Sequence, residues 1–225
     1  PHAALPYQFS RLLAGDIVLT SVTLVDPTLQ IIKHPTGRLN FQEVLKLNEG
    51  PSSGTSPLIE FRDVRITGGS LVVKLPWSPP DTVSSEASRL TSLAADRARP
   101  GRIVEESPEG LRKVLSFDSL NLRMPLLRIS TPDHQPLTFN IDSLRTLVSD
   151  PAITVRDLQA HGWTKGDSLA FTISRGALPH TRFHGGGVIT WPKGPMLYDF
   201  ALEVPLLDLE DVRGVSPDFP SLRGQ

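Results

Sequence analysis

Apolar residues alternate with polar ones over most of this chain, and this period of two constrains the fold more than any other feature of the sequence. Successive side chains of a β-strand point to opposite faces, so an alternating run forms a strand with one apolar face. The clearest runs lie in the C-terminal half, and their apolar members are Leu137, Phe139, Ile141, Leu169, Phe171, Ile173, Tyr198, Phe200 and Leu202. These residues are candidates for an apolar surface that faces a partner sheet, lipid or another protein.

Turn and bulge signals divide the strand-like runs. The run at 58–66 changes phase at Asp63, which predicts a bulge or a short turn. Gly68 and Gly69 separate this run from the next one, at 71–75, and they predict the two-residue turn of a hairpin. Further along the chain, the glycines at 185–187 predict a bulge or a tight bend before a strand at 188–191.

Two segments have a different character from the strand-like runs. Residues 41–47 place apolar side chains at helical spacing after Asn40, which is a candidate N-cap with Glu43 three residues later. Residues 76–116 lack the strand period and carry more charge, which predicts an inserted loop or a partly helical excursion, with the helix between Ser85 and Arg97. We therefore expect a mainly β fold: a curved, largely antiparallel sheet or open half-barrel of repeated hairpins, with one or two short helices and a long inserted loop.

Composition excludes several classes of protein. The chain has 23 Lys and Arg against 24 Asp and Glu, a net charge of −1, so it lacks the basic surface of a nucleic-acid-binding protein. It has no cysteine, which removes disulfides, thiolate zinc sites and iron–sulfur clusters. No apolar run approaches the ~20 residues that span a bilayer. The chain opens with Pro1 and has no signal-peptide pattern, so we read residues 1–225 as one β-rich region of a longer chain.

The sequence also carries no catalytic signature. There is no Gly-x-Ser-x-Gly string, and the glycines at 185–187 lack the Lys-Ser/Thr of a phosphate-binding loop. His180 and His184 would lie about 13 Å apart on a strand, too far to share one metal ion. The carboxylate pairs at 105–106 and 210–211 are adjacent in sequence, which predicts solvated surface positions. We therefore expect no enzyme, no cofactor and no metal.

The short strand-like motifs follow one another in an order that resembles a known protein family. Residues 17–40 read IVLTSVTLVDPTLQIIKHPTGRLN, and this stretch resembles the opening of AsmA-like proteins. In that family the first strand ends in a hydrophobic-x-x-Pro-x-hydrophobic motif. A basic strand follows it, and a Gly-x-x-Asn turn then leads into a short helix. Pro27, Gly37 and Asn40 occupy those places here.

The resemblance extends over most of the chain except residues 76–116. The stretch FRDVRITGGSL at 61–71 is similar to a hairpin motif of the family, and residues 153–158 and 183–189 are similar to motifs that come later in the family's sequences. At the C-terminal end, residues 206–209, 212 and 219–224 resemble a short helix and the restart of a further repeat.

This resemblance implies a protein of the Gram-negative cell envelope, on the periplasmic side of the inner membrane, with an upstream membrane anchor. Relatives in the family include translocation-and-assembly-module and bridge-like lipid-transfer proteins, which form a long curved sheet with an apolar groove. The family has no catalytic centre, so no site residue transfers by motif. At 225 residues this region is shorter than the long bridging members, which argues against a membrane-to-membrane conduit.

Two functional interpretations follow. In the first, the nine apolar residues line a groove that takes the acyl chains of a phospholipid. In the second, the chain is a structural docking subunit of a larger membrane-protein complex, and its strand edges and the segment at 76–116 contact the partner.

Overall fold

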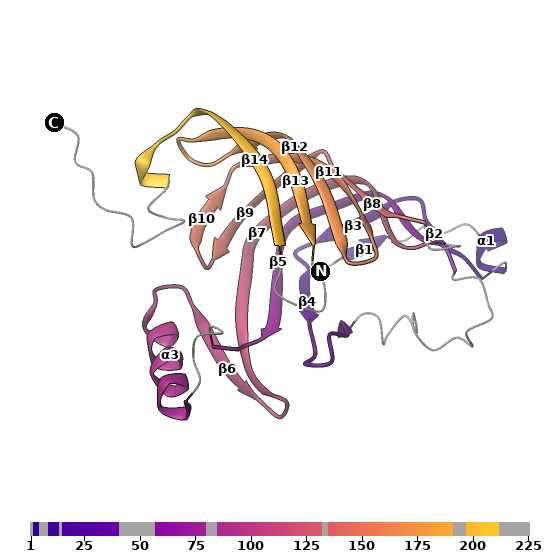
Figure 1. Ribbon diagram of the computed structural model, residues 1–225. Coiled ribbons are helices and arrows are strands. Elements are labelled where there is room, and N and C mark those ends of the chain that lie inside the picture. The colour runs from indigo at the N-terminus through magenta and orange to yellow at the C-terminus, as the bar shows by residue number, and fades with distance from the viewer. Residues whose placement is uncertain are drawn as a thin grey trace.

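The computed structural model describes residues 2–4, 9–13, 15–40, 57–79, 85–131, 135–190 and 197–211. Within these ranges the strands form one mixed, fourteen-stranded sheet that does not close into a barrel. Figure 1 shows its strands bent in a common direction, so that the sheet arches over, with one helix and one hairpin beneath it.

Sixteen elements are described. They are β1 (His2–Ala4), α1 (Phe9–Leu13), β2 (Ile17–Leu19), β3 (Val22–Val25), β4 (Thr28–Ile32), β5 (Ile59–Pro76), α3 (Glu86–Ala98), β6 (Ile103–Ser107), β7 (Gly110–Ser130), β8 (Leu137–Ile141), β9 (Ser143–Ser149), β10 (Ala152–Val155), β11 (Asp157–Lys165), β12 (Ser168–Ala177), β13 (Arg182–Thr190) and β14 (Leu197–Leu206).

The strand order is β1-β3-β5-β7-β8-β11-β12-β13-β14, with β2 and β4 also on β5, β6 and β9 on β7, and β10 on β9. From β5 onward every pairing is antiparallel, whereas β2, β3 and β4 each run parallel to β5. The prediction of a curved, mainly antiparallel open sheet is thus confirmed. The parallel strands were not foreseen, because a local pattern does not show which distant strand a run will join.

The long strand β5 corrects the hairpin predicted at Gly68 and Gly69. The chain does not turn back there; β5 continues to Pro76 beside β7, and the register shifts between Ile66 and Leu71. Gly68 has a φ of +66°, and Asp26 on the neighbouring strand region and Ser119 on β7 are also left-handed. The glycines therefore serve a bulge inside a bent strand, a use of glycine that resembles a turn signal in sequence.

Two other local signals have related outcomes. Asp63 has a φ of +44°, and the apolar side chains of β5 change from odd to even positions there without a turn. On the neighbouring side of β5, two separate strands pair before and after this residue, β2 and β3. The glycines at 185–187 lie inside β13, which begins at Arg182, not after a break at Val188. The pairing with both neighbouring strands is regular through these glycines, and the nearest register shift lies before them, between Arg182 and His184. The prediction of a bulge or tight bend at the glycines, with a strand starting after them, was therefore wrong.

The segment at 76–116 contains the predicted helix. α3 begins after Ser85, whose Oγ accepts a hydrogen bond from the Ser88 backbone N–H at 3.1 Å, the usual geometry of an N-cap. The same segment also forms β6 and the start of β7, which pair as a hairpin and which the polar pattern did not indicate. The helix predicted at 41–47 lies outside the described residues.

The packed core sits where β3, β5 and β7 meet. Val22, Val64, Ile66 and Leu120 form a buried cluster, and further apolar side chains such as Leu144 pack against it. Here the inner face of the sheet is filled by its own side chains, and this region anchors the arch.

Candidate functional site

The strand register brings all nine candidate residues onto one face of the sheet. Residues directly opposite each other on paired strands share a face, so three continuous rows can be followed across β8, β11, β12, β13 and β14. The rows are Leu137–Thr164–Leu169–Ile189–Tyr198, Phe139–Gly162–Phe171–Gly187–Phe200, and Ile141–Ala160–Ile173–Gly185–Leu202. We call these fifteen positions the apolar face.

Phenylalanine and glycine alternate along the middle row. A Cβ on Gly162 would lie 2.6 Å from Cζ of Phe139, so the phenyl ring of Phe139 occupies the space over this glycine. A Cβ on Gly187 would likewise overlap the side chain of Phe200. These glycines therefore leave room for the ring of Phe139 and for the close approach of β14, where a larger residue would not fit.

The opposite face of the same strands carries most of their polar side chains. Asn140, His161, Thr172 and Ser174 point to that side and are exposed. Exposed apolar side chains also lie there: Trp163, Val188 and Leu197, at 44%, 39% and 60% exposed. The two faces therefore differ in polarity, because the rows of the apolar face hold no charged side chain.

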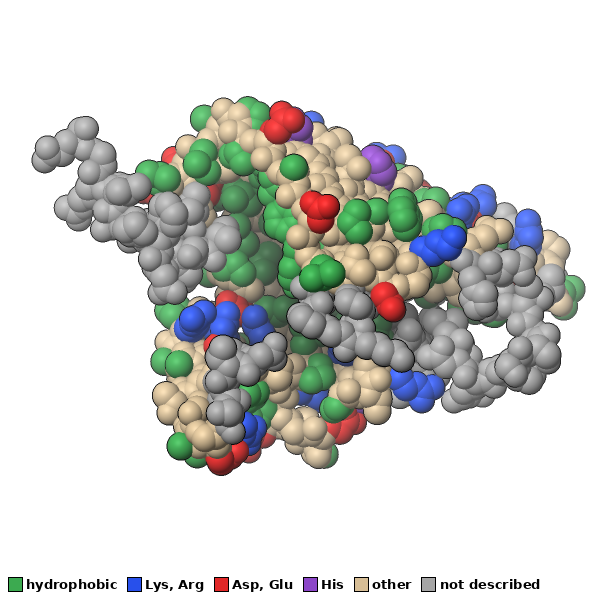
Figure 2. Space-filling view, in the orientation of Figure 1, with side chains coloured by type: hydrophobic (Ala, Val, Ile, Leu, Met, Phe, Trp, Pro, Cys, Tyr) green, Lys and Arg blue, Asp and Glu red, His purple; other side chains and the backbone are tan. Residues whose placement is uncertain are grey.

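Exposure of the apolar face rises toward the β14 edge. On β8 and β12 its side chains are partly buried, whereas Tyr198, Phe200 and Leu202 are 60%, 51% and 45% exposed. Figure 2 shows hydrophobic side chains gathered in the hollow beneath the arch. No described element covers these rows as a second layer, so the apolar face lines an open groove.

The middle row also continues toward the core. Leu127 on β7 stands opposite Phe139, and Phe61 on β5 stands opposite Leu127. From Phe61 to Phe200 the row crosses six strand spacings, a path of about 29 Å at ~4.8 Å per strand. The groove is therefore continuous and long relative to a single side-chain pocket.

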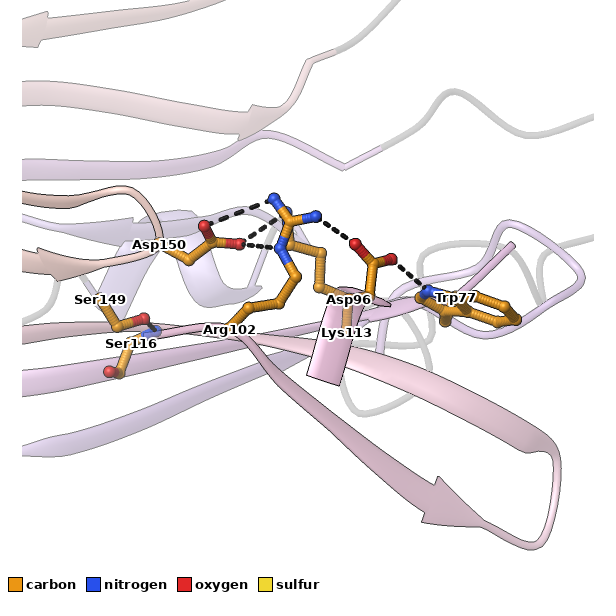
Figure 3. A network of polar contacts seen from close by, with 7 residues as sticks. All are labelled: Trp77, Asp96, Arg102, Lys113, Ser116, Ser149 and Asp150. Atoms are coloured by element: carbon orange, nitrogen blue, oxygen red, sulfur yellow. Dashed lines mark hydrogen bonds and ion pairs between the residues drawn. The ribbon is translucent and has the colours of Figure 1, made fainter. Parts of the chain in front are cut away.

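A polar network joins the α3–β6 unit to the turn between β9 and β10 (Figure 3). Arg102 lies between two carboxylates: its Nε donates to Asp150 at 2.9 Å and its Nη1 to Asp96 at 2.5 Å. Asp150 also pairs with Lys113 at 3.0 Å, and Asp96 accepts a hydrogen bond from the indole Nε1 of Trp77 at 2.8 Å. The network thus ties α3 and the segment before β6 to β7 and to the turn between β9 and β10.

The charges of this network are balanced, and the titration of the carboxylates reflects that. Burial raises the pKa of Asp150, but hydrogen bonds from Arg102 and Lys113 outweigh it and leave the pKa below its ordinary value. The pKa of Asp96 is lowered in the same way, with burial opposed by hydrogen bonds from Trp77 and Arg102. Both groups are anions at neutral pH, and the charges of Arg102 and Lys113 balance theirs.

A second charged group lies at the start of β5. Glu60 has 2% of its side chain exposed and pairs with Arg62 and Arg128, each at 2.5 Å. Burial raises its pKa, but the hydrogen bonds and positive charges of Arg128 and Arg62 outweigh burial and leave the pKa below its ordinary value. Such a buried carboxylate, held between two guanidinium groups, fits a structural role.

The remaining candidates from the sequence are scattered. His184 pairs with Glu203 at 3.1 Å, while His180 is exposed. Asp211 corrects the prediction of solvated carboxylates, since it is only 8% exposed and its Oδ2 accepts from the backbone N–H groups of His180 and Thr181. It ties the β12–β13 turn to the segment after β14. Across the described ranges, no group of three or more His, Asp or Glu side chains could hold a metal ion.

Sequence reasoning missed the contacts that depend on distant pairing. Arg102 and Asp150 are 48 residues apart, and no local pattern connects them. The one available signal was the chemistry of Asp150 next to Pro151, which indicates a turn but not its partner. Among the described residues, no helix has the length and hydrophobicity needed to cross a bilayer.

Comparison with known proteins adds no relative: no protein family, curated protein or solved structure matches this chain.

Proposed function

We propose that this chain is a non-catalytic envelope module of AsmA type, which handles lipid by holding acyl chains against the apolar face. The observation that carries the proposal is the three-row apolar face, which is uncovered by any described element. A groove of this kind suits a ligand that is long, apolar and free of directional hydrogen bonds. The AsmA-like sequence motifs support a location on the periplasmic side of the inner membrane, with a membrane anchor upstream.

The chemistry of the groove supports an acyl chain over a polar substrate. No charged side chain belongs to the fifteen positions of the apolar face, and its only polar member is Thr164 apart from the phenol of Tyr198. Burying an acyl chain there is driven by the hydrophobic effect. Binding should therefore respond weakly to salt.

Site-specific photocrosslinking tests the proposal on neighbouring residues of one strand. Phe171 belongs to the apolar face, whereas Thr172 points to the polar face and is exposed. A benzophenone amino acid at position 171, irradiated in native membranes, should give a phospholipid adduct in the mass spectrum of the denatured protein. The same probe at position 172 is the matched control and should give none.

Equal lipid labelling at the two positions would contradict the groove, because random membrane contact does not distinguish the faces. Adducts to protein alone at position 171 would favour the second candidate function, a structural docking subunit of a membrane-protein complex. One observation favours that candidate: large apolar side chains are exposed along the whole of β14.

A further inference from the structure

Two edge strands of the described sheet, β4 and β14, differ in how their outer backbone groups are satisfied. At β4, the side chain of Asn40 accepts a hydrogen bond from the Ile32 N–H and donates one to the Gln30 carbonyl, both at 3.0 Å. The amide thus takes the place of a neighbouring strand and satisfies that edge. Such protection prevents a further strand from pairing.

Over residues 199–204 of β14, no described side chain protects the outer edge in this way. β14 pairs with β13 on one side, and no other described strand lies along its second side. All ten of its residues are exposed, including Phe200, Leu202 and Val204 at 51%, 45% and 40%. An edge strand directs every second N–H and C=O away from the sheet, so it is a template for another strand. Pro205 lacks an N–H, which limits such pairing to the residues before it.

The side chains on the two faces of β14 determine which residues an added strand needs. On the inner side, Phe200 and Leu202 continue the rows of the apolar face, so an added strand needs apolar residues there. On the outer side stand Asp199 and Glu203, four residues apart. Asp199 is opposite Val188, and Glu203 is paired with His184. Cross-strand pairs of opposite charge are stabilising, and pairs of like charge are destabilising.

We propose that the outer edge of β14 at residues 199–204 binds an extended peptide segment of a protein partner, in which apolar residues alternate with basic ones and two Lys or Arg lie four residues apart. The segment adds a strand to the sheet: its backbone pairs with residues 199–204, its basic side chains meet Asp199 and Glu203, and its apolar side chains lengthen the apolar face. A second copy of β14 does not fit this description, because the strand contains no Lys or Arg.

This inference does not depend on lipid binding, so it is tested on delipidated protein. The probe is a fluorescent seven-residue peptide of alternating valine, with lysine at its second and sixth positions and threonine at the fourth. Fluorescence anisotropy should show saturable binding, which weakens as salt is raised. The matched control carries glutamate in place of both lysines and should bind at least tenfold more weakly.

Charge reversal on the protein separates specific pairing from general stickiness. In the double variant Asp199→Lys/Glu203→Lys, the preference should invert, so that the glutamate peptide binds more tightly than the lysine peptide. Both residues are exposed, and a circular dichroism spectrum unchanged from the wild type verifies the fold. If the variant binds both peptides as the wild type does, the charge argument is wrong.

Backbone methylation tests strand addition itself. Two lysine peptides are made, each N-methylated on alternate residues, so that each has one blocked edge. Since only one edge of the added strand meets β14, one peptide should bind and the other should lose binding. Equal binding of the two peptides overturns the proposal. The proposal is also overturned if light scattering shows that the protein is a dimer and that Phe200→Asp makes it a monomer, because a second copy then occupies the edge.

Discussion

Asp150 connects parts of the chain that are far apart in sequence. It receives Arg102 from the segment before β6 and Lys113 from β7, and only 10% of its side chain is exposed. At this degree of burial, removing one partner leaves the others without compensation, and the cost exceeds that of an exposed ion pair.

The Asp150→Asn substitution should therefore lower the free energy of unfolding by about 1–3 kcal/mol at neutral pH. Urea denaturation of the two proteins measures the difference. Asp167→Asn, in the exposed turn between β11 and β12, is the matched control and should change stability by less than about 0.5 kcal/mol. Equal effects would show that the network does not contribute to stability.

The pH dependence of this difference has a defined sign. The pKa of Asp150 is lowered in the folded state, so its charge contributes stability that is complete above the unfolded pKa of about 3.9. That contribution is lost as pH falls through the lowered folded pKa. The gap between wild type and Asp150→Asn should stay constant from about pH 5 to pH 7 and shrink below about pH 4. A gap that grows on acidification would contradict the assignment.

Gly176 allows a test of the close packing between rings and glycines. A Cβ on this residue would overlap the phenyl ring of Phe183 and meets no backbone atom among its nearest neighbours. Gly176→Ala should cost about 1–3 kcal/mol because the ring must move. In a Phe183→Ala background the same change should cost much less, and a double-mutant cycle from urea denaturation measures this coupling. The same cost in both backgrounds would exclude the ring as the cause.

Sequence could predict the nine apolar residues but not the residues that surround them. A period of two assigns each side chain of a strand to a face, so Phe139, Phe171 and Phe200 were assigned without knowledge of the fold. Their common row depends on which strands pair and in which register, and that information is not local. For the same reason the partners of Arg102 and Asp211 could not be predicted.

At the scale of elements, the signals at strand interruptions were the least specific. Glycine supplies left-handed backbone in a hairpin turn and in a bulge alike, so Gly68 marks a special conformation without distinguishing the two. The outcome was decided by β7, which pairs with β5 on both sides of Gly68. The helix expected between Ser85 and Arg97 does form, as α3, and Ser85 is its N-cap. Asn40, the N-cap candidate of the sequence, instead bonds through its side chain to the backbone of Gln30 and Ile32.

The N-cap of α3 gives a prediction at this scale. Ser85→Ala removes the oxygen that accepts the Ser88 N–H and should destabilise the helix by about 1 kcal/mol. No residue of α3 is buried, so the helix should open locally. Hydrogen exchange should become faster in residues 86–98 and stay unchanged in β11–β13. Ser78→Ala, at an exposed position outside any element, is the control, and faster exchange throughout the sheet would contradict a local effect.

At the scale of the whole molecule, the arch separates two tasks. Near β3, β5 and β7 the inner face is packed and supplies the core, whereas from β8 to β14 the same face is open. A sheet with one layer in its open part gains little stability from those side chains, so the exposed part of the apolar face is a candidate contact surface.

This separation predicts how a charge in the groove should act. Phe171→Asp places a carboxylate in the middle row, where an acyl chain would have to bury it without a partner. Phospholipid retained by the purified protein, measured by native mass spectrometry, should fall to near zero. Thr172→Asp adds the same charge to the polar face of the same strand and should leave retention unchanged. Because Phe171 is only partly buried, both variants should keep the urea midpoint within a small shift of the wild type. Lipid retained equally by the two variants would place the lipid outside the groove and leave the docking role as the better account of the apolar face.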